Sequence, residues 1–392
     1  LNLRGADVSF NPVFMAYLLA GVRGHTLFIE PGRLADEEVA ILAEANVTLA
    51  PYDSLFAFLQ TLPADDLILL PPATSMAALE NTAQMFRCHL PSPVATWKSV
   101  KSPGEQEALR RCMQRDGLAL TRAFTWLEKQ LEAGASLDEF RFGEVVAEFR
   151  AKGESYRGES FSPIVAFGAN GAIVHYSAPV IGSQPLKGRG LLLVDTGGQY
   201  EDGTTDVTRT LVIGGEATPE EKRAYTLVLK GHVRLAMARF PVGTNGTQID
   251  TLARLPQWER GLNYGHGTGH GVGFYLNVHE GPQRIAPSPA AAAVPLQAGN
   301  LQSNEPGMYL TGQFGVRIEN LVLVAEDPQC PGFLGFETLT LCAYEPALIE
   351  TGLLSAEEKQ WINAYHKRVW DALHKDLNRD EAKWLKERTR EL

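Results

Sequence analysis

The sequence predicts an α/β N-terminal domain over residues 1–98, followed by a larger domain of mixed helices and strands over residues 99–392. The chain of 392 residues is longer than one ordinary domain requires. Short apolar runs alternate with helical patterns over residues 1–95, which is typical of an α/β fold. Two long helical patterns follow, and from residue 159 onwards frequent glycine and β-branched residues indicate strands and turns.

The elements of the first domain are predicted from the spacing of its apolar residues. Residues 25–30 and 66–72 are short apolar runs, which indicate strands. Residues 34–47 carry apolar side chains at helical intervals behind an acidic first turn, which predicts a helix. The stretch 90–106 is rich in proline, serine and lysine, so we expect it to be the linker between the two domains.

The second domain is expected to begin with helices over residues 105–134 and 136–153, where apolar side chains have helical spacing. It is expected to end in a C-terminal helical extension at residues 344–392. Within this extension an apolar stripe runs from Trp361 to Leu373. Such a stripe is more often core or a subunit contact than a cofactor site, and it is compatible with a homodimer.

Composition excludes several classes of partner. The formal net charge is −10, from 36 basic and 46 acidic residues, which argues against nucleic acid and anionic membrane surfaces. No apolar run approaches the roughly 18 residues of a membrane span. The four cysteines lack the spacing of a zinc site and are expected to be free thiols. We therefore expect a cytoplasmic protein that binds neither nucleic acid nor membrane.

Three histidines lie close together in the glycine-rich stretch "NYGHGTGHGVGFYLNVHEGP" at residues 263–282. The alternating glycines make a helix implausible, which excludes the helical two-histidine pattern of zinc proteases. On an extended chain, residues four apart share a face, so His266 and His270 can point into one pocket. Together with His279, this pattern favours a functional site over a loop in which the histidines have no role.

Four carboxylates stand at the ends of apolar runs or within them. Asp195 ends "LLLVD", Asp206 precedes "VTRTLVI", and Glu305 precedes a Pro-Gly turn. Glu319 lies in the middle of "GVRIENLVLV", where a buried charge requires either a basic partner such as Arg317 or a bound cation. Four carboxylates and a histidine exceed the needs of one ion and predict a dinuclear centre for metal-assisted hydrolysis, without naming the substrate.

These motifs carry a more specific resemblance. The segments "DTGGQYEDGTTDVTRT", "GHGTGHGVGFYLNVHEGP", "NEPGMYL" and "VRIEN" resemble those of the pita-bread metallopeptidases, and within them the Xaa-Pro aminopeptidases of the longer cytosolic and bacterial type. The segments "LNLRGADVSFNPVFMAYLL" and "ESFSPIVAFGANGAIVHY" resemble the same family, so the resemblance covers essentially the whole chain. It implies a partial creatinase/prolidase-like α/β N-terminal domain followed by an α+β pita-bread catalytic domain.

The resemblance also implies a ligand set for two divalent ions. Asp195 would bind one ion, Asp206 and Glu319 would bridge both, and His270 and Glu305 would complete the second. The ions would be Mn²⁺, the usual metal of the family, although Zn²⁺ or Co²⁺ suit the same donors. A metal-bridging hydroxide would hydrolyse the N-terminal Xaa-Pro bond of peptides with proline in second position, releasing the first residue.

Five residues are expected to act on the substrate. By resemblance, Glu305 would shuttle the proton from the attacking water to the leaving proline nitrogen. His279 would hydrogen-bond the oxyanion, and His175 would hold the substrate backbone. His266 would line the pocket of the proline ring. Arg317 would neutralise or orient the acidic cluster, or serve only as a structural ion-pair partner.

Two alternative functions are compatible with the same fold. Prolidase, which cleaves Xaa-Pro dipeptides, is the main alternative, but the nine residues from His270 to His279 resemble the long aminopeptidases more closely. A catalytically inactive binding protein would require the loss of a metal ligand, and all five ligands are present. The long family places "LNLRGADV" inside the middle one of three domains, so we expect the preceding domain to be missing from this chain.

Overall fold

The computed structural model describes residues 1–392 except 23, 72–75, 91 and 290–291. The chain divides into two compact units, Leu1–Trp97 and Lys98–Leu392, which are described separately. In the part of the chain that the structure describes, no helix has both the length and the apolar composition needed to cross a membrane.

The first unit contains two small sheets. Strands β1 (Tyr17–Gly21), β2 (Gly24–Phe28) and β3 (Val47–Ala50) form one sheet, with β1 antiparallel to β2 and β2 parallel to β3. Strands β4 (Leu67–Leu70) and β5 (Phe86–His89) form a parallel pair.

Helices connect these strands. Helix α1 (Asp36–Glu44) links the parallel strands β2 and β3, and the short helices η1 (Tyr52–Ser54), α2 (Leu55–Gln60) and α3 (Met76–Asn81) follow. The strands expected at 25–30 and 66–72 and the helix expected at 34–47 are thus confirmed, with residue 72 outside the described part. The expected helix is shorter than predicted, because its last residue, Val47, already belongs to β3.

The expected linker at 90–106 is largely helical, apart from residue 91, which is not described. It contains α4 (Pro93–Ser99) and the start of α5 (Pro103–Glu132). Proline suits the first position of a helix, because the N–H that it lacks has no partner there. Ser102 and Glu105 form a capping box at the start of α5. The boundary between the two units lies within this stretch, as predicted, although most of it is helical.

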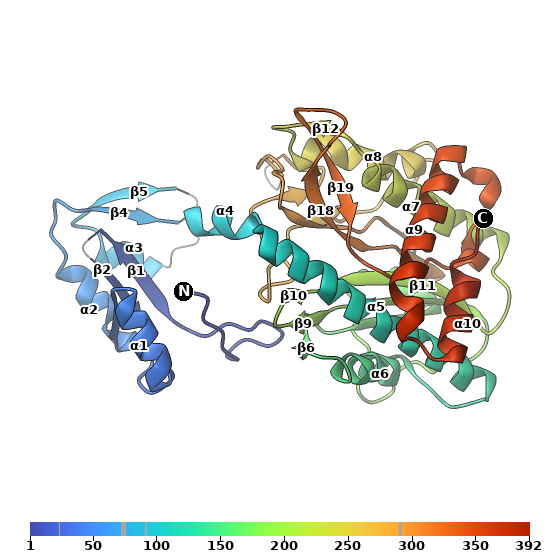
Figure 1. The fold of residues 1–392 in the computed structure, drawn as a ribbon, viewed down its shortest axis with the longest axis horizontal. Coiled ribbons are helices and arrows are strands. Elements are labelled where there is room, and N and C mark those ends of the chain that lie inside the picture. The colour runs from blue at the N-terminus through green and yellow to red at the C-terminus, as the bar shows by residue number, and fades with distance from the viewer. Residues whose placement is uncertain (23, 72–75, 91, 290–291) are drawn as a thin grey trace. The chain divides into compact units, whose positions relative to one another are not determined.

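The second unit surrounds its strands with long helices (Figure 1). Helices α5 and α6 (Glu139–Ala151) come first, as the sequence predicts, and α7 (Pro219–Ala236) and α8 (Gly246–Trp258) follow. The C-terminal extension forms α9 (Ala356–Leu373) and α10 (Arg379–Arg388). Short 3₁₀ turns are η2 (Gly168–Ala172), η3 (Pro346–Leu348), η4 (Thr351–Leu353) and η5 (His374–Asp376).

The strands of this unit form several small sheets that are antiparallel throughout their described pairs. One has the order β11 (Val207–Ile213), β8 (Gly190–Thr196), β7 (Ile164–Phe167), and another has the order β12 (Phe240–Pro241), β19 (Phe333–Thr338), β18 (Asn320–Glu326), β15 (Leu301–Asn304). A third sheet joins β10 (Gly203–Thr204), β9 (Gly198–Tyr200) and β6 (Tyr156–Glu159). Two hairpins, β13 (Gly269–His270) with β14 (Arg284–Ile285) and β16 (Gly307–Leu310) with β17 (Phe314–Arg317), complete the unit.

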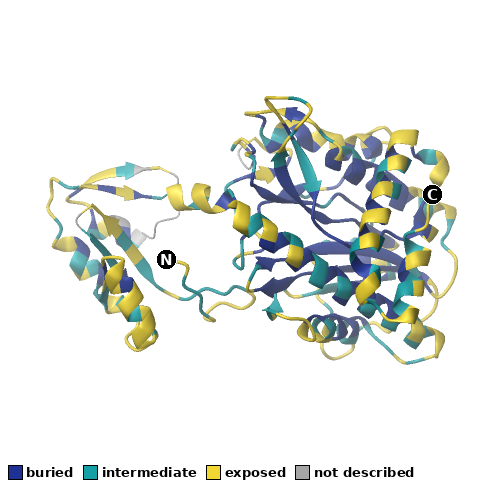
Figure 2. Ribbon diagram, viewed as in Figure 1, coloured by how far each residue is buried: buried dark blue, intermediate teal, exposed yellow. Residues whose placement is uncertain are grey.

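In the second unit the strands are buried and the helices are exposed on their outer faces (Figure 2). The apolar stripe of α9 lies inside this core, since Ile362, Tyr365, Val369 and Leu373 are buried in one cluster with residues of α7 and β17. The stripe therefore packs within the chain itself, and the homodimer stays a prediction.

Candidate metal centre

Two neighbouring strands bring Asp195 and Asp206 together. Asp195 is the penultimate residue of β8, and Asp206 directly precedes β11. The two strands are antiparallel, with Thr196 opposite Val207, so both carboxylates lie at the same end of the sheet. The turn between them requires glycine at 197, because a Cβ there would lie 2.0 Å from the Thr205 carbonyl oxygen.

A second strand pair brings Glu305 and Glu319 to the same place. β15 runs antiparallel to β18 with Asn304 opposite Asn320, so the next pair along this register is Glu305 and Glu319. The Glu319 N–H donates to the Thr208 carbonyl at 3.1 Å, which ties this pair to β11. The Glu305 N–H donates to the Thr268 carbonyl at 2.8 Å, two residues before His270.

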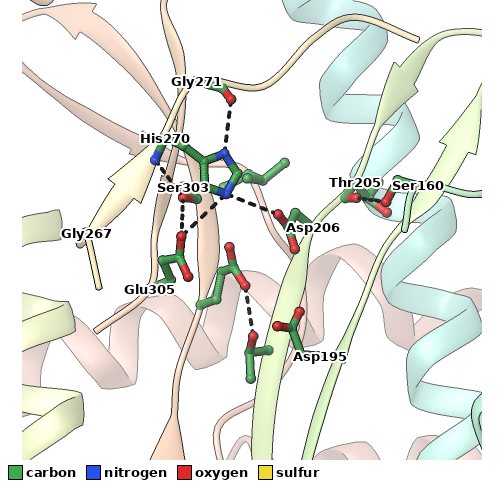
Figure 3. Close-up of polar contacts among 12 residues, drawn as sticks. Ser160, Asp195, Thr205, Asp206, Gly267, His270, Gly271, Ser303 and Glu305 are labelled. Carbon is green, nitrogen blue, oxygen red and sulfur yellow. Dashed lines mark hydrogen bonds and ion pairs between the residues drawn. The ribbon is translucent and has the colours of Figure 1, made fainter. Parts of the chain in front are cut away.

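The five side chains predicted as metal ligands therefore converge. His270 Nε2 lies 3.5 Å from Asp206 Oδ2 and 3.4 Å from Glu305 Oε1 (Figure 3). Two groups of three residues have ligand atoms within 4.8 Å of one another. The first group is Asp195, Asp206 and Glu319, and the second is His270, Glu305 and Glu319, so Glu319 belongs to both. A third such group joins Asp206, His270 and His279, so His279 lies beside the five predicted ligands.

The chemistry of this cluster fits divalent cations. Asp195 Oδ1 and Glu319 Oε1 are buried and have no hydrogen-bond partner among the described residues. Such orphaned carboxylate oxygens are costly unless a cation pairs with them. Carboxylate oxygens with one imidazole nitrogen are donors that suit Mn²⁺, and Zn²⁺ or Co²⁺ could take the same set.

Burial perturbs the acids and the histidine in the absence of ions. Burial and the neighbouring carboxylates raise the pKa of Glu305 to about 7 and that of Asp206 to about 6. The same causes raise the pKa of Glu319 well above its usual value. Burial alone would lower the pKa of His270, but Asp206 and Glu305 outweigh it and raise that pKa to about 9.

Arg317 pairs with Asp195 and not with its sequence neighbour Glu319. Its guanidinium donates to Asp195 Oδ2 at 2.6 Å and to the Tyr309 hydroxyl at 2.9 Å. Glu319 instead accepts from the Thr208 hydroxyl at 2.8 Å. Arg317 and Glu319 both face the same cavity and both contact the Thr208 hydroxyl, but the guanidinium reaches past Glu319 to Asp195.

The three remaining histidines line one cavity of about 630 Å³ together with the five ligands and Arg317. The rest of its wall is partly apolar and includes Phe161, Ile164, Val174, Ala286 and Pro287. A cavity of about 700 Å³ beside α7 holds none of these polar groups, so the chemistry belongs to the first.

Each histidine has a different environment. His266 is held by hydrogen bonds to the Gly267 carbonyl at 2.8 Å and the Tyr309 hydroxyl at 2.8 Å. Burial lowers the pKa of His266 and of His279 to about 4, so both imidazoles are neutral at neutral pH. His175 is exposed at the wall of the cavity.

Sequence reasoning missed three groups that support the centre. Tyr309 links His266 to Arg317, Thr208 binds Glu319, and Ser303 Oγ donates to Glu305 Oε1 at 3.3 Å. All three stand inside or beside the quoted motifs, which is the signal that could have found them.

Family models match almost the whole chain. Residues 107–326 match metallopeptidase family M24, residues 332–392 match the C-terminal region of peptidase M24, and residues 1–105 match the creatinase/prolidase N-terminal domain. The predicted fold class, an α/β domain followed by an α+β pita-bread domain, is thereby confirmed.

Relatives among curated proteins carry the name probable Xaa-Pro aminopeptidase P. One from Coprinopsis cinerea is 42% identical over 99% of this chain and 66% of its own length. Another from Laccaria bicolor is 41% identical over 98% of this chain and 62% of its own length. The chain thus spans about two thirds of the length of these relatives.

Solved structures agree with this assignment. The X-prolyl aminopeptidase of Caenorhabditis elegans, described as a cytosolic enzyme with a di-nuclear active site, matches with a TM-score of 0.94 and 34% identity over 99% of this chain and 65% of that one. The prolidase of Pyrococcus furiosus has a TM-score of 0.64 at 22% identity over 83% of this chain and 89% of that one, and shares the fold alone. The predicted resemblance is confirmed, and the chain belongs to metallopeptidase family M24.

Proposed function

We propose that this chain is a dinuclear metallo-aminopeptidase that hydrolyses the N-terminal Xaa-Pro bond of peptides with proline in second position. The observation that carries the proposal is the buried cluster of four carboxylates and one imidazole with orphaned oxygens on Asp195 and Glu319. This cluster lines the same cavity as three further histidines. The names of the curated relatives support the substrate class.

Two divalent ions, which we propose to be Mn²⁺, would activate a water molecule as nucleophile and stabilise negative charge on the scissile carbonyl. Asp195 would hold one ion and Glu305 and His270 the other, with Asp206 and Glu319 shared between them. Arg317 lowers the repulsion within this set through its ion pair with Asp195.

The chain's own side chains would handle the proton and the substrate. Glu305 would take a proton from the attacking water and return it to the proline nitrogen, which becomes a secondary amine as the bond breaks. His279, neutral at neutral pH, can donate a hydrogen bond to the carbonyl oxygen as charge develops on it. His266, held by Tyr309, would flank the proline ring, and His175 would bind the peptide backbone.

The proposal includes where the protein acts. Peptides are its expected partners. Nucleic acid and anionic membranes are not, because the protein carries a net charge of −10 and would repel them. Cytoplasmic location is supported by the cytosolic description of the C. elegans enzyme and by four free cysteines.

The test is hydrolysis of the tripeptide Arg-Pro-Pro beside the dipeptide Gly-Pro by Mn²⁺-loaded protein. Release of arginine from the tripeptide, abolished in Glu305→Gln, is the expected result. Glu345→Gln is the matched control, because Glu345 is a buried carboxylate outside the cavity, and this variant should keep its activity. Preference for the dipeptide would assign the prolidase activity instead, and cleavage of neither peptide would overturn the proposal.

A further inference from the structure

The loop that carries His175 has little regular structure of its own. It follows the 3₁₀ turn η2 and runs without a helix or strand to the start of β8 at Gly190. The His175 side chain is exposed and makes no hydrogen bond to the described residues. The position of His175 therefore depends on the backbone that carries it.

The next residue along the chain is anchored to a buried carboxylate. Tyr176 donates its hydroxyl to Glu139 Oε2 at 2.6 Å and accepts from Asn170 Nδ2 at 2.9 Å. Asn170 Nδ2 also donates to Glu139 Oε1 at 2.9 Å, and the Phe167 N–H donates to the same oxygen at 2.6 Å. Glu139 thus binds the end of β7, the turn η2 and the residue beside His175.

Glu139 is unusual because it is fully buried and has no basic partner among the described residues. It is the first residue of α6, where the helix dipole favours a negative charge, and neutral donors supply the rest of its stabilisation. Burial and then Glu139 raise the pKa of Tyr176, so the hydroxyl keeps its proton and donates. Release of the loop would leave part of a buried charge without a donor, which opposes that release.

A second attachment holds the chain just before His175. Gly171 in η2 packs against Gly315 in β17 so closely that a Cβ on Gly315 would lie 1.7 Å from the Gly171 carbonyl oxygen. β17 also carries Arg317, which binds Asp195. The segment that presents His175 is therefore fixed to a strand of the candidate centre before the residue and to α6 after it.

We propose that Glu139, Asn170 and Tyr176 form a positioning triad that fixes the loop segment from which His175 reaches the wall of the substrate cavity. The triad rests on the proposed function, in which His175 holds the peptide backbone. Val174 and His175 line the cavity, whereas no triad member does, so the triad acts through the loop and not by touching substrate. A loop held in place before binding avoids the entropy loss of being ordered by the substrate.

Kinetics of Tyr176→Phe test the triad, because this change removes the hydroxyl and keeps the ring. We expect kcat/KM for Arg-Pro-Pro to fall about tenfold in the wild-type background, the size of a modest positioning loss. In a His175→Ala background the same change should cause no further loss, since its effect passes through His175. Equal losses in both backgrounds, or no loss in the first, would overturn the proposal.

The matched control is Tyr225→Phe, which removes a buried hydroxyl that accepts from the Glu345 N–H in the core. It should lower the melting temperature as Tyr176→Phe does, yet leave kcat/KM unchanged. A fall in kcat/KM of the same size in this control would assign the effect of Tyr176→Phe to general stability.

Hydrogen exchange provides a measurement that needs no activity. Amides of residues 168–176 should exchange faster in Tyr176→Phe than in the wild type or in Tyr225→Phe. Unchanged exchange would refute the anchor. If the wild type cleaves no tripeptide, the proposed function fails, but faster exchange in this loop would still establish the anchor.

Discussion

Removing divalent cations should make the stability of the catalytic unit fall as the pH rises. In the metal-free protein, burial and neighbouring carboxylates raise the pKa of Glu305 from its usual 4.5 to about 7. One pKa unit corresponds to about 1.36 kcal/mol, so this shift represents about 3 kcal/mol from one group. Asp206, with its pKa raised from 3.8 to about 6, acts in the same direction.

The pH window follows from these shifts. Unfolded Glu305 loses its proton near pH 4.5, whereas the folded protein keeps it until about pH 7, so stability is lost between these values. His270 adds to the effect, because its pKa is raised from 6.5 to about 9. Its contribution is present below pH 6.5 and is lost as the pH rises through about 9. Bound cations would pair with the ionised carboxylates and remove this loss.

Urea unfolding at about pH 5.5 and about pH 8, with chelator or with Mn²⁺, measures the effect. The change in unfolding free energy with pH is compared between the protein with chelator and the protein with Mn²⁺. Burial also raises the pKa of Glu159 to about 7, but Glu159 contributes equally to both samples, so the difference between them reports on the metal centre. The metal-free Glu305→Gln variant should show a smaller loss with pH. A metal-free protein that is equally stable at both pH values, or more stable at the higher one, would refute this reasoning.

Three further changes test the packing around the centre. Burial lowers the pKa of Lys101 from 10.5 to about 8, which means that its charged form destabilises the folded protein at neutral pH. Lys101→Met should therefore raise the free energy of unfolding at neutral pH by about 2 kcal/mol. This figure allows about 1 kcal/mol for the lost hydrogen bond to the Lys98 carbonyl. This gain should shrink between pH 8 and 10.5 in urea unfolding, and a lower midpoint at neutral pH would contradict it. Gly315→Ala should cost about 3 kcal/mol in thermal unfolding, because its Cβ would strike the Gly171 backbone, and an unchanged midpoint would contradict that contact. Arg150→Met should cost about 3–5 kcal/mol by leaving Asp116 buried and unpaired, and a double variant with Asp116→Asn should recover most of the loss.

Local pattern was sufficient for the helices at 34–47, 105–134 and 136–153 and for the candidate ligands. Helices α5 and α6 follow from apolar spacing, which depends only on residues a few positions apart. A buried glutamate inside an apolar run of the sequence, such as Glu319, requires a partner wherever that run lies in the fold. The stretch 90–106 contains the boundary between the two units as predicted, and it is largely helical because proline and serine are as common at helix starts as in linkers.

Only the tertiary structure decided which groups meet. The sequence left open whether Arg317 pairs with Glu319, and the fold pairs it with Asp195, 122 positions away. The apolar stripe of α9 predicted a buried face but not that the chain's own core covers it. No sequence pattern indicates that Glu139 and Tyr176 are in contact, although the fold joins them by a hydrogen bond. Periodicity and composition determine which residues are buried or charged, whereas strand register and helix packing between distant segments determine their partners.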